Sequence, residues 1–430
     1  MPSANYQMNY QFYKKIAVFN QVFFQQYYDF RNIVTVETFL LSRRIFSSSV
    51  EDDRFDMAIL ELQRIDEIND FETEWNQLLA QSLDNNPFLT YEWLTSWWKH
   101  FGKGRELKLF TTESQGAISL LVPIMYSKYK VFGSRRLKVE LAASGDSDYQ
   151  GFLITNFQKA AGTINLLIES IMEDTKDGDC VTFGEIPEDS ATAILLEGIK
   201  GKDFGVSRSA SSTCPYVPLP NNYDIFNQTL GPNMRRNLKI WEKQALKDYR
   251  VKFVRYDEIG TVQEAMKIFC ELHQKSQIAK GNCGVFSDNL KRSFHNDVAN
   301  AFAEKGWLGL FFLTFNDKPV STVYSYEYNG KLYAYLCGFD PEYSRYRPGH
   351  LAFKNLIKYG IDKKLKELDF LRGDEEYKSR WRATIRNNFE FRVPKRGLKS
   401  KFYNWTADSR SFSYLNRVPV LSQRLFAEVH

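Results

Sequence analysis

Cysteine, histidine and long apolar runs are all scarce in this sequence. Among 430 residues there are five cysteines, with no CxxC pair, and five histidines, none at the spacing of a zinc site. An odd number of scattered cysteines does not suit a disulfide framework, so we expect reduced thiols and no metal. No segment approaches the roughly 18 apolar residues that span a bilayer, and the N-terminal stretch, rich in Gln, Asn and Tyr, lacks a secretory apolar core. The sequence therefore predicts a cytoplasmic protein.

An excess of charge of either sign is also missing. The chain carries 57 basic and 52 acidic residues, a net charge of +5. Such a balance gives no general attraction for nucleic acid, so we expect no DNA partner, and any electropositive function requires local clustering. The chain is instead typical of a globular protein, with 43% hydrophobic, 25% charged and 15% aromatic residues.

The length and the order of patterns predict two similar domains. Domains usually hold roughly 100 to 200 residues. We place an N-terminal domain at 57–218 and a C-terminal domain at 219–400, joined near a cluster of prolines and asparagines. Residues 1–56 are interpreted as an extension outside the fold, with Met57 as an alternative natural start, and 401–430 as a tail.

Each half shows strands, a helix, a strand, a helix and a final strand. In the first half we expect strands 107–112, 118–125 and 137–141, helix 160–172, strand 179–183, helix 191–199 and strand 206–212. In the second half we expect strands 307–315, 320–328 and 331–338, a helix carrying Phe353 to Ile361, strand 368–371, a helix carrying Tyr377 and Trp381, and strand 389–393. The fold class is therefore α/β, with a mixed sheet in each of two tandem domains.

An arginine-rich turn, GFDPEYSRYRPGH, separates a strand from a helix in the second half. Helix starts have unpaired N–H groups and a partial positive charge, so this turn suits the pyrophosphate of an acyl donor. The residues predicted to bind the donor are Asp340, Arg345, Tyr346, Arg347, Gly349 and His350. The alternative is an ordinary turn with solvated arginines.

A second polar segment, LDFLRGDEEYKSRW, follows the next strand. Ligands of open sheets bind beyond the carboxyl ends of strands, so Arg372, Asp374 and Lys378 are predicted to bind the acceptor, with Glu375 as a catalytic candidate. The alternative is a solvated ion-pair stripe on a helix.

Two further residues are candidates for the base that takes a proton from the acceptor. His273 extends the apolar face of a helix, and Asp369 lies between apolar neighbours in a strand, where burial should raise its pKa. A buried structural histidine and a structural acid bonded to backbone are the alternatives.

A basic stripe marks the helix from about Asn233 to Tyr249. Arg235, Lys239, Lys243 and Lys247 recur every four residues, opposite an apolar face. Arg235 and Lys239 are predicted to bind an anionic acceptor, a lipid head group or RNA, and a solvated helix face is the alternative.

With these motifs in this order, roughly residues 60 to 395 resemble the CelD/BcsL-type acetyltransferases, in the FemAB-like, tandem-domain branch of the GNAT superfamily. The resemblance rests on NPFLTYEWLTSWW, GDSDYQGFLI, MRRNLKIWEK, ELHQKSQ, YLCGFDPEYSRYRPGH and ELDFLRGDEEYKSRWR. It implies GNAT-like mixed sheets and acyl transfer to an amine or hydroxyl. The donor loop departs from the family pattern, because Tyr346 stands where Gln or Arg belongs and Leu351 where a second small residue belongs.

Three functions are consistent with these residues. The first is acyl transfer from acetyl-CoA or another acyl-CoA to a sugar, polysaccharide or cell-envelope precursor. The second is an aminoacyl-tRNA-dependent, FemAB-like peptide-bridge transferase, in which the basic stripe contacts tRNA. The third is a non-catalytic GNAT-like module of an exopolysaccharide or envelope synthesis complex. Under the first and third, association with membrane-bound synthesis machinery is expected.

Overall fold

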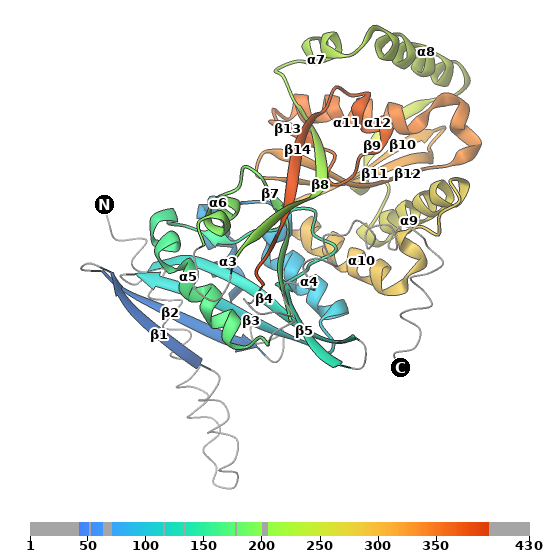
Figure 1. Ribbon diagram of the computed structural model, residues 1–430. Coiled ribbons are helices and arrows are strands. Elements are labelled where there is room, and N and C mark those ends of the chain that lie inside the picture. Colours follow the sequence, from blue (N-terminus) through green and yellow to red (C-terminus); the bar gives the residue numbers. More distant parts are fainter. Residues whose placement is uncertain are drawn as a thin grey trace.

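One large mixed sheet organises the chain (Figure 1). The computed structural model describes residues 43–50, 53–62, 71–114, 117–131, 134–176, 179–199 and 205–394. Within them, 14 strands form one sheet, in the order β1-β2-β3-β4-β5-β7-β14-β8-β13-β12-β11-β10-β9, with β6 paired to β4. The predicted mixed α/β fold is confirmed.

The first half supplies one end of the sheet and the helices that cover it. Its elements are β1 (Arg43–Val50), β2 (Asp53–Leu62), α3 (Glu72–Gln81), η2 (Pro87–Leu89), α4 (Tyr91–Phe101), β3 (Arg105–Ser114), β4 (Ala117–Val131), β5 (Ser134–Leu141), β6 (Leu153–Ile154), α5 (Phe157–Glu173), β7 (Cys180–Pro187), α6 (Ala191–Glu197) and β8 (Ser207–Pro218). Helices α5 and α6 pack on one face of these strands, and α3 and α4 contribute to the core on the other.

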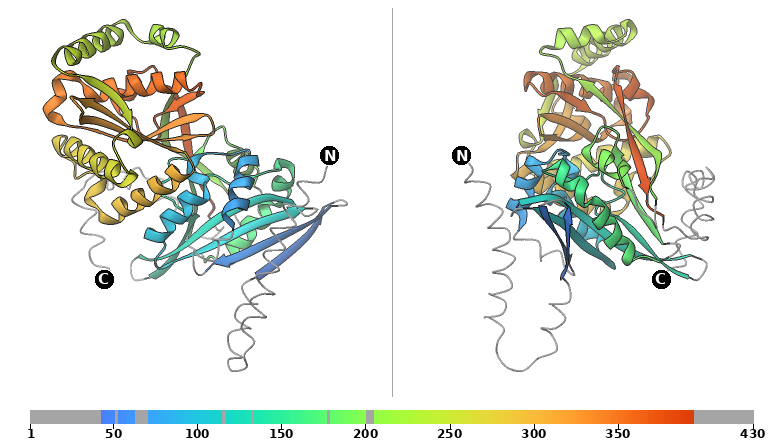
Figure 2. Two further views of the ribbon diagram at one scale, coloured as in Figure 1. Left: turned by 180° about the vertical axis from the view of Figure 1, so that it is seen from behind. Right: turned by 60° about the vertical axis from the view of Figure 1, so that its left-hand side comes forward.

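The second half repeats this order at the other end of the sheet. Its elements are α7 (Tyr223–Thr229), α8 (Pro232–Asp248), β9 (Val251–Arg255), η3 (Tyr256–Glu258), α9 (Val262–Ala279), η4 (Val285–Ser287), α10 (Asn289–Glu304), β10 (Leu308–Phe315), β11 (Lys318–Tyr328), β12 (Lys331–Phe339), η5 (Pro341–Tyr346), α11 (Pro348–Asp362), β13 (Glu367–Asp369), α12 (Glu376–Ser379) and β14 (Thr384–Arg392). Figure 2 shows α7 and α8 as the outermost layer of this half, beyond α11.

The two halves are joined because strands of each half pair with strands of the other. Strand β14 of the second half lies between β7 and β8, and β8 in turn pairs with β13. A shared core adds to this joint, because Trp93 on α4 is fully buried and lies edge-on to Phe294 on α10, with ring centroids 5.1 Å apart. The two predicted domains therefore share one sheet and one part of the core.

Two features differ from the boundaries expected from sequence. Strand β2 begins at Asp53 and pairs with β3, and Arg43–Val50 pairs with β2, so this part of the expected extension 1–56 belongs to the sheet. Residues 1–42 and 395–430, which include the whole predicted tail 401–430, lie outside the described residues. The expected joining segment also starts later than predicted, because β8 continues through Pro215, whose carbonyl accepts a hydrogen bond from the Phe370 N–H. No helix in the described ranges is long and apolar enough to cross a bilayer.

Candidate active site

The pairing of β12 with β13 is confined to the start of β12. These parallel strands share three register pairs, from Lys331 with Glu367 to Tyr333 with Asp369. Beyond Asp369 the chain turns toward β8, while β12 continues to Phe339. The carboxyl-terminal part of β12 therefore has no partner strand on this edge within the described sheet, and the two strands part at this point.

A β-bulge lies in β12 just beyond this point. The register with β11 pairs Tyr324 with Leu336 and Ser325 with Ala334, so Tyr335 has no opposite residue. Bulges turn a side chain out of the regular pleat and are frequent beside active sites. The Tyr335 hydroxyl donates a hydrogen bond to the carbonyl oxygen of Asp146 in the first half, over 2.8 Å. The bulge therefore aims a β12 side chain at the other half of the molecule.

His273 lies behind β12, on α9. Its side chain is buried, and Nδ1 lies 2.9 Å from the carbonyl oxygen of Cys337. Because a carbonyl can only accept, Nδ1 carries the proton, which leaves a lone pair on Nε2. Nε2 has no hydrogen-bond partner in the described structure. Burial lowers the pKa of His273, helped by Lys280, although the bond to Cys337 opposes this. His273 is thus a neutral imidazole with one unused basic atom.

Gly338 allows α9 to lie this close to β12. A Cβ at position 338 would stand 2.5 Å from both the Cα and the backbone nitrogen of His273. Since backbone atoms cannot move aside as a flexible side chain can, we expect Gly338→Ala to lower the free energy of unfolding by about 2 to 3 kcal/mol, measured by urea denaturation. Gly349→Ala is the control, because its Cβ meets only Phe339, at 4.0 Å. Equal stability of the two variants would contradict this close approach.

A second buried histidine, His295 on α10, was not predicted. Its Nδ1 also lacks a hydrogen-bond partner in the described structure, and burial lowers its pKa to about 3. Phe286 of η4 stands between the two histidines, with ring centroids 5.2 Å from His273 and 5.6 Å from His295. In the sequence, the spacing of Phe294, His295, Val298 and Phe302 indicates the buried face of a helix. That spacing does not indicate a functional role for the imidazole.

Asp369, the last residue of β13, lies at the seam between the halves. It is fully buried and accepts hydrogen bonds from the Tyr149 hydroxyl at 2.7 Å, from Nη1 of Arg386 at 2.8 Å and from the Leu371 N–H at 2.7 Å. Burial raises its pKa to about 6, although Arg386 and Tyr149 oppose the shift. The desolvation expected from sequence is present. The three donors all belong to the protein, so the contacts describe an internal joint between β13, β14 and the first half.

Arg372 and Lys378 are also engaged by the protein. Arg372 forms ion pairs with Asp148 at 3.0 Å and Glu185 at 3.4 Å, both in the first half. The Lys378 side chain is 3% exposed, and its ammonium lies 2.8 Å from the exposed carboxylate of Glu375 and donates to the carbonyls of residues 371, 372 and 373. The alternative, a solvated charged face on a helix, does not describe Lys378: α12 has only four residues, and Lys378 turns inward because the sharp bend before it leaves these carbonyls to be satisfied. Asp374 is exposed.

The arginine-rich turn is held by its own acids and aromatics. Asp340 caps η5 and accepts from Lys275 at 2.8 Å; burial works to raise its pKa, but the Lys275 bond and the cap lower it overall. Tyr346 is buried, and its hydroxyl donates to Asp248 over 2.6 Å. Arg345 contacts the same two groups, Tyr346 and Asp248. These three predicted donor-binding residues therefore build the turn.

Arg347, Gly349 and His350 form the open part of the turn. Arg347 is exposed, has φ 51° and ψ 52°, and makes no ion pair within the described residues. Pro348 has no N–H, and the N–H groups of His350 and Leu351 donate to the Arg347 carbonyl. His350 is half-buried with no partner for Nε2, and burial lowers its pKa to about 4, helped by Arg380 and Arg347. A positive potential at a helix start is what an anion needs.

Arg235 and Lys239 lie on α8, in the layer beyond α11. Arg235 is half-buried and donates to the carbonyl of Gln228 at 3.0 Å, whereas Lys239 is exposed. The structure does not bring either residue into the group around Asp369 and Arg372. It adds Tyr149, Asp148 and Glu185 of the first half to that group.

Comparisons with known proteins agree with this geometry. Residues 232–379 match the family model described as an acetyltransferase (GNAT) domain. No curated protein sequence matches the chain. The solved structure of FemX is similar at 13% identity, covering 80% of this chain and 99% of FemX with a TM-score of 0.56.

Two more distant structures also align with the chain. A conserved protein of unknown function from Bacteroides thetaiotaomicron has 14% identity, covers 75% of this chain and 97% of its own, and gives a TM-score of 0.48. A tandem GNAT protein from the clavulanic acid biosynthesis pathway has 9% identity, covers 79% and 99%, and gives 0.44. The family match includes β12, the turn and α11, so residues 232–379 are similar to a GNAT acetyltransferase domain, and the chain as a whole has a fold similar to that of FemX.

Proposed function

We propose that this protein transfers an acyl group from an acyl-CoA donor to an amine or hydroxyl of a sugar, polysaccharide or cell-envelope precursor. The observation that carries the proposal is the parting of β12 and β13 beside the positive start of α11. The positive start of α11 would bind the charged groups of an anionic donor, and the edge of β12 beyond β13 would contact its acyl-bearing chain. The GNAT match supports the reaction class.

The residues of the turn fit a diphosphate group. Arg345 is already paired with Asp248, whereas Arg347 makes no ion pair within the described residues. Arg347 and Arg380 both act electrostatically on His350. Arg347 and the backbone at Gly349 would therefore hold the diphosphate of coenzyme A. Leu351 stands where the family pattern has a small residue. Its side chain is buried in the core of this half, so it does not fill the turn.

The chain's own groups supply the remaining parts of the reaction. A thioester donor supplies an activated acyl carbon. Backbone N–H groups at the unpaired edge of β12 would stabilise the negative charge that develops on the acyl oxygen. His273 Nε2, the free basic atom behind β12, would take the proton from the acceptor as the new bond forms.

Arg347→Ala is expected to weaken binding of acetyl-CoA about fivefold to tenfold, because it removes a charge-assisted contact to phosphate worth about 1 kcal/mol or slightly more at an exposed site. Isothermal titration calorimetry measures this directly. Arg345→Ala is the matched control and should change the affinity by less than about twofold, since its guanidinium is occupied by Asp248 and Tyr346.

Three outcomes would reject the donor assignment. Unchanged affinity in Arg347→Ala would remove the turn from donor binding. Absence of any heat with acetyl-CoA, together with salt-sensitive binding of aminoacyl-tRNA, would replace the proposal by the FemAB-like reaction. If neither donor binds, the third expectation, a non-catalytic module, takes its place.

A further inference from the structure

The outward face of α8 combines cations with exposed aliphatic side chains. Successive residues of an α-helix turn by about 100°, which places six exposed residues within an arc of about 120°. These six, here called the outer face of α8, are Arg236, Lys239, Ile240, Lys243, Leu246 and Lys247. Ile240 is 44% and Leu246 58% exposed. The stripe predicted from sequence is therefore shifted, with Arg236 replacing Arg235 and two apolar residues added.

The opposite face of α8 fixes this orientation. Met234, Leu238 and Ala245 are buried in the core that includes α11. Trp241 packs against His350 at the start of α11, with ring centroids 5.1 Å apart. Because the inner face is held this firmly, the six outer residues point away from the rest of the second half, where Figure 1 shows α8 as an outer layer.

The acids of α8 do not neutralise its outer face. Glu242 is bound by Lys354 at 2.6 Å, and Asp248 accepts from Tyr346 at 2.6 Å and contacts Arg345. Both acids are thus committed to the α11 side. The four cations of the outer face make no ion pair within the described ranges, so they repel one another unless an external anion is bound.

We propose that the outer face of α8 docks on an anionic lipid bilayer. Each lysine or arginine near such a surface adds electrostatic attraction, and aliphatic side chains between the cations gain by entering the acyl boundary. Helix α7 lies in the same outer layer (Figure 2) and carries Ile225, which is 48% exposed. An RNA surface would not use Ile240 and Leu246, and this face has no aromatic side chain on which a base could stack.

Docking in this orientation would lay the bilayer behind the proposed donor turn. The inner face of α8 contacts the turn through Trp241 and His350, and through Asp248 and Tyr346. The proposed donor turn would therefore lie on the side of α8 away from the bilayer, and a membrane-bound acceptor would approach the second half from the α8 side.

Flotation of the full chain with lipid vesicles tests the proposal. We expect binding to vesicles of equal parts phosphatidylcholine and phosphatidylglycerol and not to phosphatidylcholine alone. Lys239→Glu/Lys243→Glu/Lys247→Glu should reduce the bound fraction by more than about tenfold. Ile240→Ser/Leu246→Ser, which keeps every charge, should reduce it several-fold.

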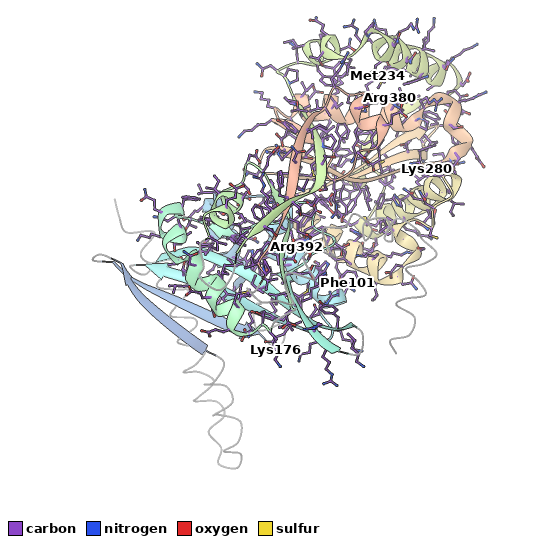
Figure 3. The ribbon with its side chains drawn as sticks, in the orientation of Figure 1. Phe101, Lys176, Met234, Lys280, Arg380 and Arg392 are labelled. Carbon is purple, nitrogen blue, oxygen red and sulfur yellow. The ribbon has the colours of Figure 1, made fainter. Side chains whose placement is uncertain are left out.

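The control carries the same change of charge elsewhere. Lys103, Lys176 and Lys267 are exposed lysines with no ion pair in the described structure. Figure 3 places Lys176 at the opposite end of the molecule from Met234 of α8. Lys103→Glu/Lys176→Glu/Lys267→Glu should bind anionic vesicles like the wild type. An unchanged melting temperature in each variant shows that all of them fold.

Three results would overturn the proposal. These are no binding of the wild type to anionic vesicles, equal loss in the control triple variant, or full binding by Ile240→Ser/Leu246→Ser. Binding of tRNA by the wild type without vesicle binding, lost in the α8 triple variant, would assign the face to RNA instead. Vesicle binding needs no acyl donor, so a negative result leaves the proposed acyl transfer standing.

Discussion

Replacing Asp369 by alanine is expected to lower the free energy of unfolding by about 3 kcal/mol, because a largely buried guanidinium loses its closest acid. Arg386 keeps Glu367 at 3.3 Å, which places the effect at the lower end of the usual range for a broken buried pair. The Tyr149 hydroxyl loses its acceptor as well. These groups come from β13, β14 and the first half, so the substitution should weaken the contact between the halves. Chemical denaturation measures the loss as a lower free energy of unfolding.

Two controls separate this joint from a general effect of removing an acid. Asp374→Ala, five residues further on and exposed, should change the stability by less than about 0.5 kcal/mol. Asp369→Ala combined with Arg386→Met should recover part of the loss, because the uncompensated charge is gone. A double variant whose loss is the sum of the two single losses would show that the ion pair does not couple these strands.

The pH dependence of stability provides an independent measure of the same carboxyl. Burial raises the pKa of Asp369 from 3.8 to about 6, so the folded state holds its proton more tightly than the unfolded state does. This group therefore contributes most below 3.8, and its contribution declines as the pH rises to about 6. The decline in this window should be smaller in Asp369→Ala than in the wild type.

Local patterns in the sequence were sufficient for most of the second-half sheet. The Asn329-Gly330 turn has φ values of 48° and 73°, as a two-residue hairpin turn requires. The buried strands and the helix after the arginine-rich turn also follow from apolar spacing. These elements are fixed by interactions between residues near one another in the chain, which is the information that periodicity contains.

The parts of the site that could not be predicted from the sequence depend on contacts between residues far apart in the chain. Tyr149 meets Asp369 across 220 positions, and Asp148 meets Arg372 across 224. No local pattern encodes the insertion of β14 between β7 and β8, on which these contacts depend. Lys378 was predicted to bind the acceptor, with a solvated helix face as the alternative, whereas the bend at residues 371–373 turns its ammonium toward three carbonyls of the protein.

The polar loop around Asp148 was recognised as a motif in the sequence, but no function was predicted for it. Its sequence, GDSDYQ, contributed only to the family resemblance. In the structure it brings Asp146 to Tyr335, Asp148 to Arg372 and Tyr149 to Asp369. The first half thus positions the site of the second half, and a duplicated pattern alone could not show which half serves the other.

Replacing His273 by asparagine is expected to lower kcat by about 100-fold to 10,000-fold, the usual contribution of a general base. Asparagine can still donate an N–H to the Cys337 carbonyl but offers no basic atom in place of Nε2, so the substitution separates proton transfer from positioning of α9. The KM for the donor should stay near the wild-type value. In the wild type, the loss of rate on acidification should be centred below pH 6.5, the ordinary value for histidine, because burial lowers the pKa of His273. Full activity in His273→Asn, with an unchanged pH profile, would reject His273 as the base and favour a reaction that depends on positioning alone.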